Sequence, residues 1–306
     1  MNRRSFLAWS ALAPVAAVHG IVKPGGPYRQ SGAARPSGTP FPTGSPHLDA
    51  ILGGGLMPGE LTLLALTPGS EIMDFLAISI LDHHLQRHPE PVALVTARWN
   101  RDVLIRRLAT SRGGVDRPRA SRPLWRSPQE REAYEDAARS IRASAFHYES
   151  IQRVRFLGDV ERSLRSVHES HSLAVIILDD IVELRDIACS ESREEAAARV
   201  GRHLREMARS MCVPILAGCP VAWATEWPSD APELTPGFLP PSQRNLGPLV
   251  PMLDHCDAAL FASELPQLAK REWRIRIDVA FHPRASRGSC TCHTIDRLSG
   301  RISDGA

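Results

Sequence analysis

The sequence predicts a three-layer α/β domain with a mostly parallel central sheet. The first observation is that apolar runs of four to six residues alternate with longer amphipathic stretches from residue 60 onward. Strands that are buried on both faces form such runs, and parallel strands need crossover helices between them. The second observation is the length of 306 residues, which is enough to bury a core of this kind without disulfides.

The expected elements follow one another in the order that a parallel sheet requires. Short apolar runs predict strands at residues 61–66, 92–96, 174–178, 213–217, 252–262 and 273–281. Amphipathic stretches predict helices at residues 73–86, 101–109 and 193–211. Two segments interrupt the alternation, residues 112–129, rich in Arg and Pro, and residues 223–251, rich in Pro. We expect both to be surface loops.

Residues 1–22 have the pattern of an export signal or of an additional helix. Arg3 and Arg4 precede an uncharged, mostly apolar stretch at residues 6–18, which resembles a twin-arginine signal. The stretch is too short to span a membrane. The alternatives are a helix that packs on the domain or on a neighbouring subunit, and a start codon placed too early.

A linker is expected between this segment and the domain. Residues 23–42 are dominated by Pro, Gly, Ser and Thr, which bury little apolar surface and favour an extended chain. The domain is therefore expected at residues 43–300. Its charge balance, 37 Lys and Arg against 34 Asp and Glu with a net of +3, is too even to predict nucleic-acid binding.

The cysteines and histidines predict no metal site. The six cysteines are unevenly spaced, unlike a secreted disulfide framework. Cys290, Cys292 and His293 lie together but lack the second half of a tetrahedral site. His84 and His88 share one face of a predicted helix, and we expect them to face solvent.

Two turn motifs precede the first predicted strand. Residues 43–49 read TGSPHLD and residues 54–61 read GGLMPGEL. This pattern resembles the entry to a DnaB-type or KaiC-type ATPase domain, TGxxxLDxxxGGLxPGxL, where glycines permit the tight turns before the phosphate loop. The resemblance implies a RecA-like P-loop NTPase fold, ATP and Mg²⁺ as cofactors, and assembly into a hexameric ring.

The phosphate loop departs from the family pattern. A Walker A loop, GxxxxGK(S/T), cradles phosphates with backbone amides, neutralises them with lysine and holds Mg²⁺ through a hydroxyl. Here residues 67–75 read TPGSEIMDF against the family's RPSMGKTTF. The loop positions are Pro68, Gly69, Ser70, Glu71, Ile72 and Met73. Glu71, Ile72 and Met73 replace glycine, lysine and threonine, so a carboxylate repels phosphate and the cation is missing.

Three further positions correspond to catalytic groups of the family. Arg98 replaces the glutamate that orients the attacking water, so a cation stands in place of a general base. Residues 174–180, AVIILDD, resemble the Walker B strand, and either Asp179 or Asp180 would hold the Mg²⁺ shell. Pro220 replaces the glutamine that senses the γ-phosphate and couples it to DNA.

An arginine finger is implied near the C-terminus. Residues 257–261, DAALF, resemble the family's strand DADVVLF, and the segment that follows lies where a neighbouring subunit would receive the finger. Arg284, or alternatively Arg287, corresponds to it, and Phe281 stands at the lysine usually paired with it.

The resemblance implies a DnaB-like replicative helicase core, and the joint departures at Glu71, Ile72, Arg98 and Pro220 predict that catalysis is lost. ATP and Mg²⁺ are then expected to bind weakly or not at all. The first hypothesis is a pseudo-ATPase that serves as a binding or assembly module. It would associate with itself, with an active helicase or with single-stranded DNA, in the cytoplasm and without a membrane span. The alternatives are an active ATP-dependent DNA helicase with an atypical phosphate loop, and an exported protein that is no ATPase.

Overall fold

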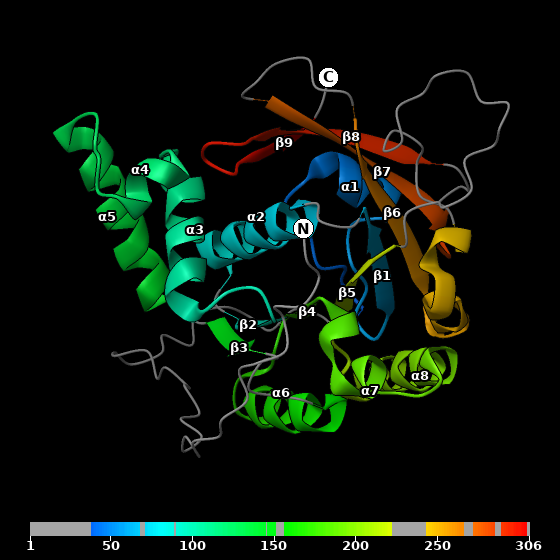
Figure 1. Ribbon diagram of the computed structural model, residues 1–306. Helices are drawn as coiled ribbons and strands as arrows, with labels where there is room; N and C mark the ends of the chain where they lie inside the picture. The colour runs from blue at the N-terminus through cyan, green and yellow to red at the C-terminus, as the bar shows by residue number, and fades with distance from the viewer. Residues whose placement is uncertain are drawn as a thin grey trace, which may run out of the picture.

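A single mixed sheet forms the centre of the protein (Figure 1). The computed structural model describes residues 38–67, 71–88, 90–144, 146–150, 156–221, 243–265, 272–284 and 289–304. Within these ranges the strand order is β3-β2-β4-β5-β1-β6-β7-β8-β9. All pairings from β3 through β6 are parallel, and the pairings from β6 to β9 are antiparallel.

The strands are β1 (Leu61–Leu66), β2 (Val92–Thr96), β3 (Phe146–Ser150), β4 (Val175–Asp179), β5 (Ile215–Pro220), β6 (Ala258–Glu264), β7 (Glu272–Phe281), β8 (Cys290–Asp296) and β9 (Ile302–Asp304). The α-helices are α1 (Pro46–Ile51), α2 (Ile72–Arg87), α3 (Arg101–Gly113), α4 (Arg117–Ser121), α5 (Pro128–Ala143), α6 (Leu157–His171), α7 (Arg185–Ala188) and α8 (Arg193–Met211). Two segments form 3₁₀ turns, η1 (Ile181–Glu183) and η2 (Gln243–His255).

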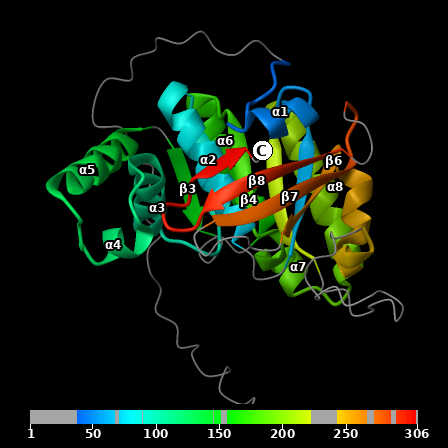
Figure 2. The same ribbon diagram turned by 90° about the horizontal axis from the view of Figure 1, so that it is seen from above.

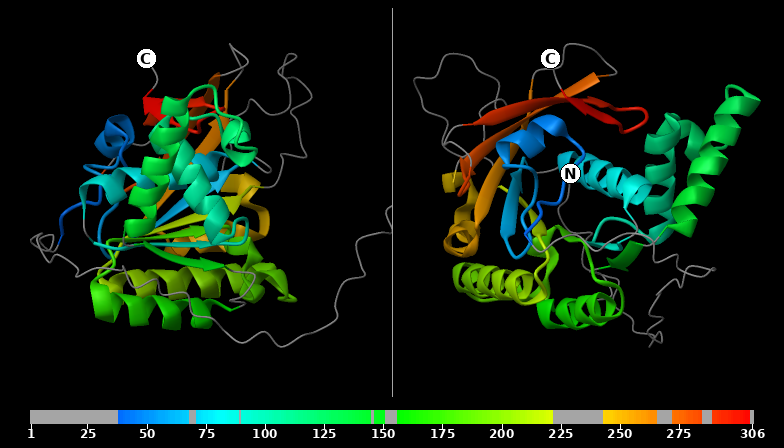
Figure 3. Two further views of the ribbon diagram at one scale, coloured as in Figure 1. Left: turned by 90° about the vertical axis from the view of Figure 1, so that its left-hand side faces the viewer. Right: turned by 180° about the vertical axis from the view of Figure 1, so that it is seen from behind.

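Helices cover both faces of the parallel strands, which confirms the predicted three-layer architecture. Helices α2 and α3 pack on one face, and α6, α7 and α8 lie on the other (Figures 1 and 3). Alternate residues of β1 enter different cores, since Leu64 joins the cluster under α2 and Leu63 joins the cluster under α8. Both faces of the strand are therefore buried, which explains its uninterrupted apolar sequence. Figure 2 shows α4 and α5 projecting to one side of the sheet.

The first turn motif is held together by one carboxylate. The backbone amide and the hydroxyl of Thr43 both donate to Asp49 Oδ1, at 2.7 and 2.8 Å. Ser45 caps α1 by accepting a hydrogen bond from the Leu48 amide at 3.0 Å. The Thr and Asp of the motif thus fix the path of the chain into its first helix.

The second turn motif closes against the segment before Thr43. Phe41 is 1% exposed and forms a two-residue bridge with Leu56, with N–O distances of 2.6 and 2.8 Å. Gly55 directly precedes Leu56 and packs against the Phe41 backbone with φ +125°, a conformation that other residues rarely adopt. The folded part therefore already includes Phe41, two residues before the expected start of the domain. At the other end β9 lies beyond residue 300.

Three sequence predictions were wrong in detail. Residues 112–129 are not one loop, because they contain the end of α3, the whole of α4 and the start of α5. The strand predicted at 252–262 begins only at Ala258, since Met252 to His255 belong to η2. His84 is 0% exposed, where its ring stacks against Phe41 with centroids 5.0 Å apart, so it does not face solvent.

Several expectations lie outside the described residues. These are the signal-like segment at residues 1–22, the linker up to residue 37, and residues 223–242 of the predicted Pro-rich loop. Residues 243–251 of that loop are found in η2. Among the helices within the described ranges, none is both long and apolar enough to cross a membrane.

The bridge beside Gly55 predicts a sensitive position. In the Gly55→Ala variant the new methyl group would collide with the Phe41 carbonyl oxygen, and the positive φ would be strained. We expect the free energy of unfolding to fall by about 2 kcal/mol or more, measured by urea denaturation. Gly158→Ala is the matched control, because a Cβ at that helical position meets nothing within 4 Å. A Gly55→Ala variant as stable as this control would contradict the assignment.

Candidate functional site

Four parallel strands end at one edge of the sheet, and the predicted site residues gather there. Thr96 at the end of β2 is in register with Asp179 at the end of β4, and Leu66 of β1 is in register with Pro220 of β5. Ligands of open α/β sheets bind outside the carboxyl ends of the strands. The positions of Glu71, Arg98, Asp179 and Pro220 are therefore brought together, as the resemblance implied.

The described part of the phosphate-loop segment contains no exposed cation. Pro68, Gly69 and Ser70 lie outside the described residues. Ile72 and Met73 are both 0% exposed and belong to the core under α2. The Ile72 side chain, at the position of the family's lysine, is thus part of the apolar interior.

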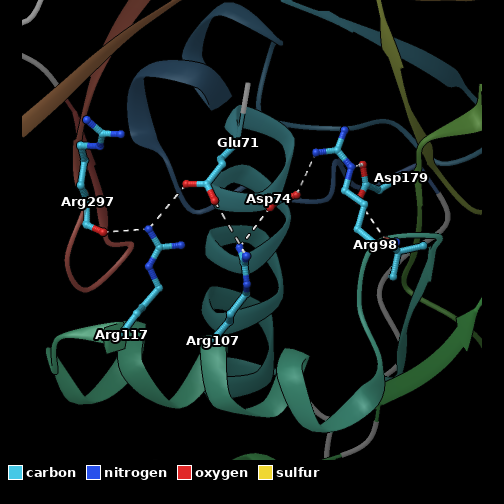
Figure 4. A network of polar contacts seen from close by, with 8 residues as sticks. Glu71, Asp74, Arg98, Arg107, Arg117, Asp179 and Arg297 are labelled. Carbon is cyan, nitrogen blue, oxygen red and sulfur yellow. Dashed lines mark hydrogen bonds and ion pairs between the residues drawn. The ribbon is translucent and has the colours of Figure 1, made fainter. Parts of the chain in front are cut away.

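The Arg98 guanidinium lies between two buried carboxylates (Figure 4). Its Nη1 is 3.5 Å from Asp74 Oδ1, and its Nε is 3.5 Å from Asp179 Oδ1. The side chains of Asp74 and Asp179 are 5% and 2% exposed. Thr96 completes the arrangement, because its hydroxyl donates to Asp179 Oδ2 at 3.0 Å and accepts from the Arg98 amide at 3.0 Å. Arg98 therefore pairs with Asp179, the aspartate at the end of β4.

A second group of charges surrounds Glu71 at the start of α2 (Figure 4). Arg107 Nη2 is 3.9 Å from Glu71 Oε1, and its Nη1 donates to Asp74 Oδ2 at 3.0 Å. Arg117 Nη2 is 3.7 Å from Glu71 Oε2 and donates to the Arg297 carbonyl at 2.7 Å. A helix N-terminus favours a nearby negative charge, and here the chain's own carboxylate supplies it.

Aromatic rings hold both of these arginines. The Arg107 guanidinium lies 4.5 Å from the centroid of the Trp99 ring, and that of Arg117 lies 4.7 Å from the centroid of Phe75. Such contacts stabilise a cation by about 0.5–2 kcal/mol. The pKa of Arg117 is lowered by burial, with the positive charges of Arg107 and Arg297 adding to the effect.

Burial raises the pKa of the carboxyl groups at this edge. The pKa of Asp74 rises to about 7, although the positive charges of Arg107 and Arg98 lower it. The pKa of Asp179 is also raised by burial, and that of Asp180 is raised to about 6 by the same cause. Negative charge is therefore costly here in the absence of an adjacent cation.

Asp179 and Asp180 differ in their surroundings. Asp179 is the last residue of β4 and contacts Thr96 and Arg98. Asp180 caps η1 instead, with Oδ1 accepting from the Val182 amide at 3.2 Å. Asp179 is thus the aspartate whose side chain lies in the charge network.

Arg284 lies away from this edge. Its guanidinium forms two hydrogen bonds with Glu60, at 2.8 and 3.0 Å. Glu60 directly precedes β1, whereas the network lies beyond the other end of that strand. The arginine-finger candidate is therefore paired within its own chain, and Arg287 lies outside the described residues.

Asp74, Arg107 and Arg117 were not predicted from the sequence. One signal was available, because Asp74 interrupts an otherwise apolar run of α2 and a buried carboxylate needs a cation nearby. Which arginines supply that cation depends on how α3 and α4 pack. No periodicity in the sequence contains this information.

The described residues at this edge, which exclude 68–70, do not fit Mg²⁺ and ATP. A metal shell on Asp179 would have to displace the Arg98 guanidinium, and phosphates at the start of α2 would meet the Glu71 carboxylate. The position that should carry a neutralising lysine is buried isoleucine. Each of these features opposes the binding of a metal–polyphosphate complex.

Comparison with solved structures places the fold among RecA-type ATPases. The first is a DnaB-like replicative helicase studied for its interactions with primase. It has a TM-score of 0.73 at 16% identity, with 90% of this chain and 65% of that chain covered. The ATPase domain of G40P gives 0.72 at 16% identity, with coverage of 89% and 94%. The RadB recombinase gives 0.53 at 18% identity, with coverage of 87% and 100%. The chain thus spans about 65% of the length of the first helicase.

Sequence comparison assigns the family. No curated protein is significantly similar to the chain. The family model of the DnaB-like helicase C terminal domain, however, matches residues 40–234. This range contains both turn motifs, the altered phosphate loop, Arg98 and the strand that ends at Asp179. The chain therefore belongs to the DnaB-like helicase C-terminal domain family.

Proposed function

We propose that this protein is a pseudo-ATPase of the DnaB-like family, which uses its RecA-like fold as a binding or assembly module. The observation that carries the proposal is the position of Arg98 between Asp74 and Asp179. The Arg98 guanidinium, which belongs to the chain itself, supplies the positive charge that the two buried carboxylates need. The edge is consequently stabilised without a bound metal or nucleotide.

The other altered positions support the same proposal. Glu71 is matched by Arg107 and Arg117, so the carboxylate at the start of α2 belongs to an internal network. Ile72 contributes apolar surface to the core. The departures at Arg98, Glu71 and Ile72 each fit their surroundings, which favours a stable, inactive arrangement over an ATPase with a merely unusual loop.

The proposed partners are further copies of this chain, an active helicase or single-stranded DNA, in the cytoplasm. Ring assembly in the family supports self-association, and we propose that here it does not depend on nucleotide. Sedimentation velocity of the full chain tests this proposal, with an unchanged distribution expected on adding ATP and Mg²⁺. A distribution that shifts to larger species only with ATP and Mg²⁺ would argue against it.

Nucleotide binding is the most direct test. Titration of the full chain with a fluorescent ATP analogue is expected to show no saturable binding up to about 1 mM, which corresponds to roughly −4 kcal/mol. The result should be the same with and without Mg²⁺ and in the Asp179→Ala variant. Micromolar, Mg²⁺-dependent binding that this variant abolishes would instead establish the active helicase alternative.

Removal of the internal cation should destabilise the fold. In Arg98→Ala the carboxylates of Asp74 and Asp179 lose a shared partner. Loss of one member of a buried pair costs about 3–5 kcal/mol. Because Arg98 is 32% exposed, water screens part of this interaction, and we expect about 2 kcal/mol. Chemical denaturation measures the change.

Arg139→Ala is the matched control, since it removes an ion pair with Asp136 whose two side chains are 76% and 58% exposed. Its effect should be within about 0.5 kcal/mol. An Arg98→Ala variant that is as stable as this control would show that the network contributes little.

Stability should also depend on pH through Asp74. Its pKa is raised from an ordinary 3.8 to about 7, so the folded chain binds more protons than the unfolded chain between these values. The free energy of unfolding therefore falls as pH rises across this window. In Asp74→Asn this contribution is absent, and the loss of stability between pH 5 and pH 7.5 should be smaller. Parallel pH profiles of the two proteins would refute the assignment.

A further inference from the structure

The outer face of the antiparallel extension carries two cysteines side by side. Cys290 and Cys292 occupy alternate positions of β8, so their side chains point to the same face of the sheet. Cys290 is exposed and Cys292 is half-buried. The residues between and after them, Thr291 and His293, are buried on the opposite face. Both thiols are thus available from solvent on one surface.

One edge of this segment is open among the described strands. β8 is paired with β7 along the whole length of β8. On its other side, the described pairing with β9 involves only residues 293–295 of β8. No described strand therefore flanks Cys290 and Cys292 on that side. A small reagent or ion can approach the pair without displacing a neighbouring strand.

An arginine lies directly beside both thiols. Arg276 is the cross-strand neighbour of Cys292, and Asp278 is that of Cys290. Arg276 donates to Asp278 through Nε and Nη2, with distances of 2.6 to 3.0 Å. Its guanidinium therefore extends along β7 from the position opposite Cys292 to the position opposite Cys290. The pKa of Arg276 is raised, chiefly by this hydrogen bond, with the charge of Asp278 adding to it.

The spacing of the two thiols selects one type of chemistry. Alternate residues of a strand are about 6.6 Å apart, whereas the Cβ atoms of a disulfide are about 3.5–4.5 Å apart. A direct disulfide would therefore require movement of the backbone. With metal–sulfur bonds of about 2.3 Å, two sulfurs on opposite sides of one ion are about 4.6 Å apart. The two side chains reach this separation by turning toward each other.

We propose that Cys290 and Cys292 form a two-coordinate binding site for a soft monovalent cation, with Cu(I) as the physiological candidate. Thiolates select Cu(I) over harder ions. Binding replaces two protons by one cation, so that two thiols and Cu(I) yield a bis-thiolate complex of charge −1 and two H⁺. The guanidinium of Arg276, which is also paired with Asp278, is the positive group nearest to that negative charge among the described cross-strand neighbours. In the sequence, this cysteine pair lacked the further ligands that a tetrahedral metal site needs. A linear two-coordinate site needs only the two thiolates.

The remaining cysteines differ from this pair. Cys219 and Cys256 are buried, and burial raises the pKa of both thiols, that of Cys256 to about 12. Such thiols are poor ligands because they resist deprotonation. Cys189 and Cys212 are exposed, but they lie at separate places, after α7 and at the end of α8.

The test is an anaerobic titration of the reduced full chain with Cu(I) in the presence of a bathocuproine chelator. We expect one equivalent to be taken from the chelator by the wild type and by the Cys189→Ser/Cys212→Ser control. Cys290→Ser and Cys292→Ser should each lose it, with circular dichroism confirming that both variants are folded. Arg276→Gln should bind about 10-fold to 100-fold more weakly, as for other groups that surround a metal site.

Two outcomes would overturn the proposal. One is a wild type that takes no copper from the chelator. The other is a folded Cys290→Ser or Cys292→Ser variant that retains the full equivalent, because a single thiolate would then suffice. Neither outcome depends on whether the protein binds ATP, so the test is separate from that of the proposed function.

Discussion

Two carboxylates buried close together at the end of a parallel sheet require a cation between them. Asp74 and Asp179 are 3% and 1% exposed, and water cannot supply the missing stabilisation. Arg98 does so from the loop after β2, and it thereby connects α2, β2 and β4 through charge. Thr96 belongs to the same arrangement, because its hydroxyl donates to Asp179 Oδ2. Arg107 then stabilises the outer oxygen of Asp74.

Much of the sheet could be predicted because burial on both faces leaves a clear pattern. The predicted bounds of β1, β2 and α8 agree with the structure. Helix α5 was missed because only Ala137, Ala138 and Ile141 are buried, so few positions carry the apolar period. Helix α6 was missed despite a usable signal, since its buried residues recur at helical spacing. The fifth predicted strand, at 252–262, was started too early because η2 packs an apolar run against α8, and such a run resembles a buried strand in sequence.

The candidate site was predictable in position but not in its contacts. The motifs that contain Arg98, Asp179 and Pro220 were recognised in the sequence, and the sheet register brings the ends of β2, β4 and β5 to one edge. Asp74, Arg107 and Arg117 were not predicted. Their pairing depends on how α2, α3 and α4 pack, and residues separated by more than twenty positions in sequence leave no local pattern for it.

The residues at the positions that depart from the family pattern depend on one another for charge balance and packing. A glutamate in place of Arg98 would bring a third carboxylate to Asp74 and Asp179, where burial already raises the pKa of both. A lysine in place of Ile72 would put an ammonium group at a position that is 0% exposed within an apolar cluster. A glycine in place of Glu71 would leave Arg107 and Arg117 without their shared carboxylate. Each family residue, introduced alone, would therefore cost stability, so the internal network favours retention of Glu71, Ile72 and Arg98 as a set.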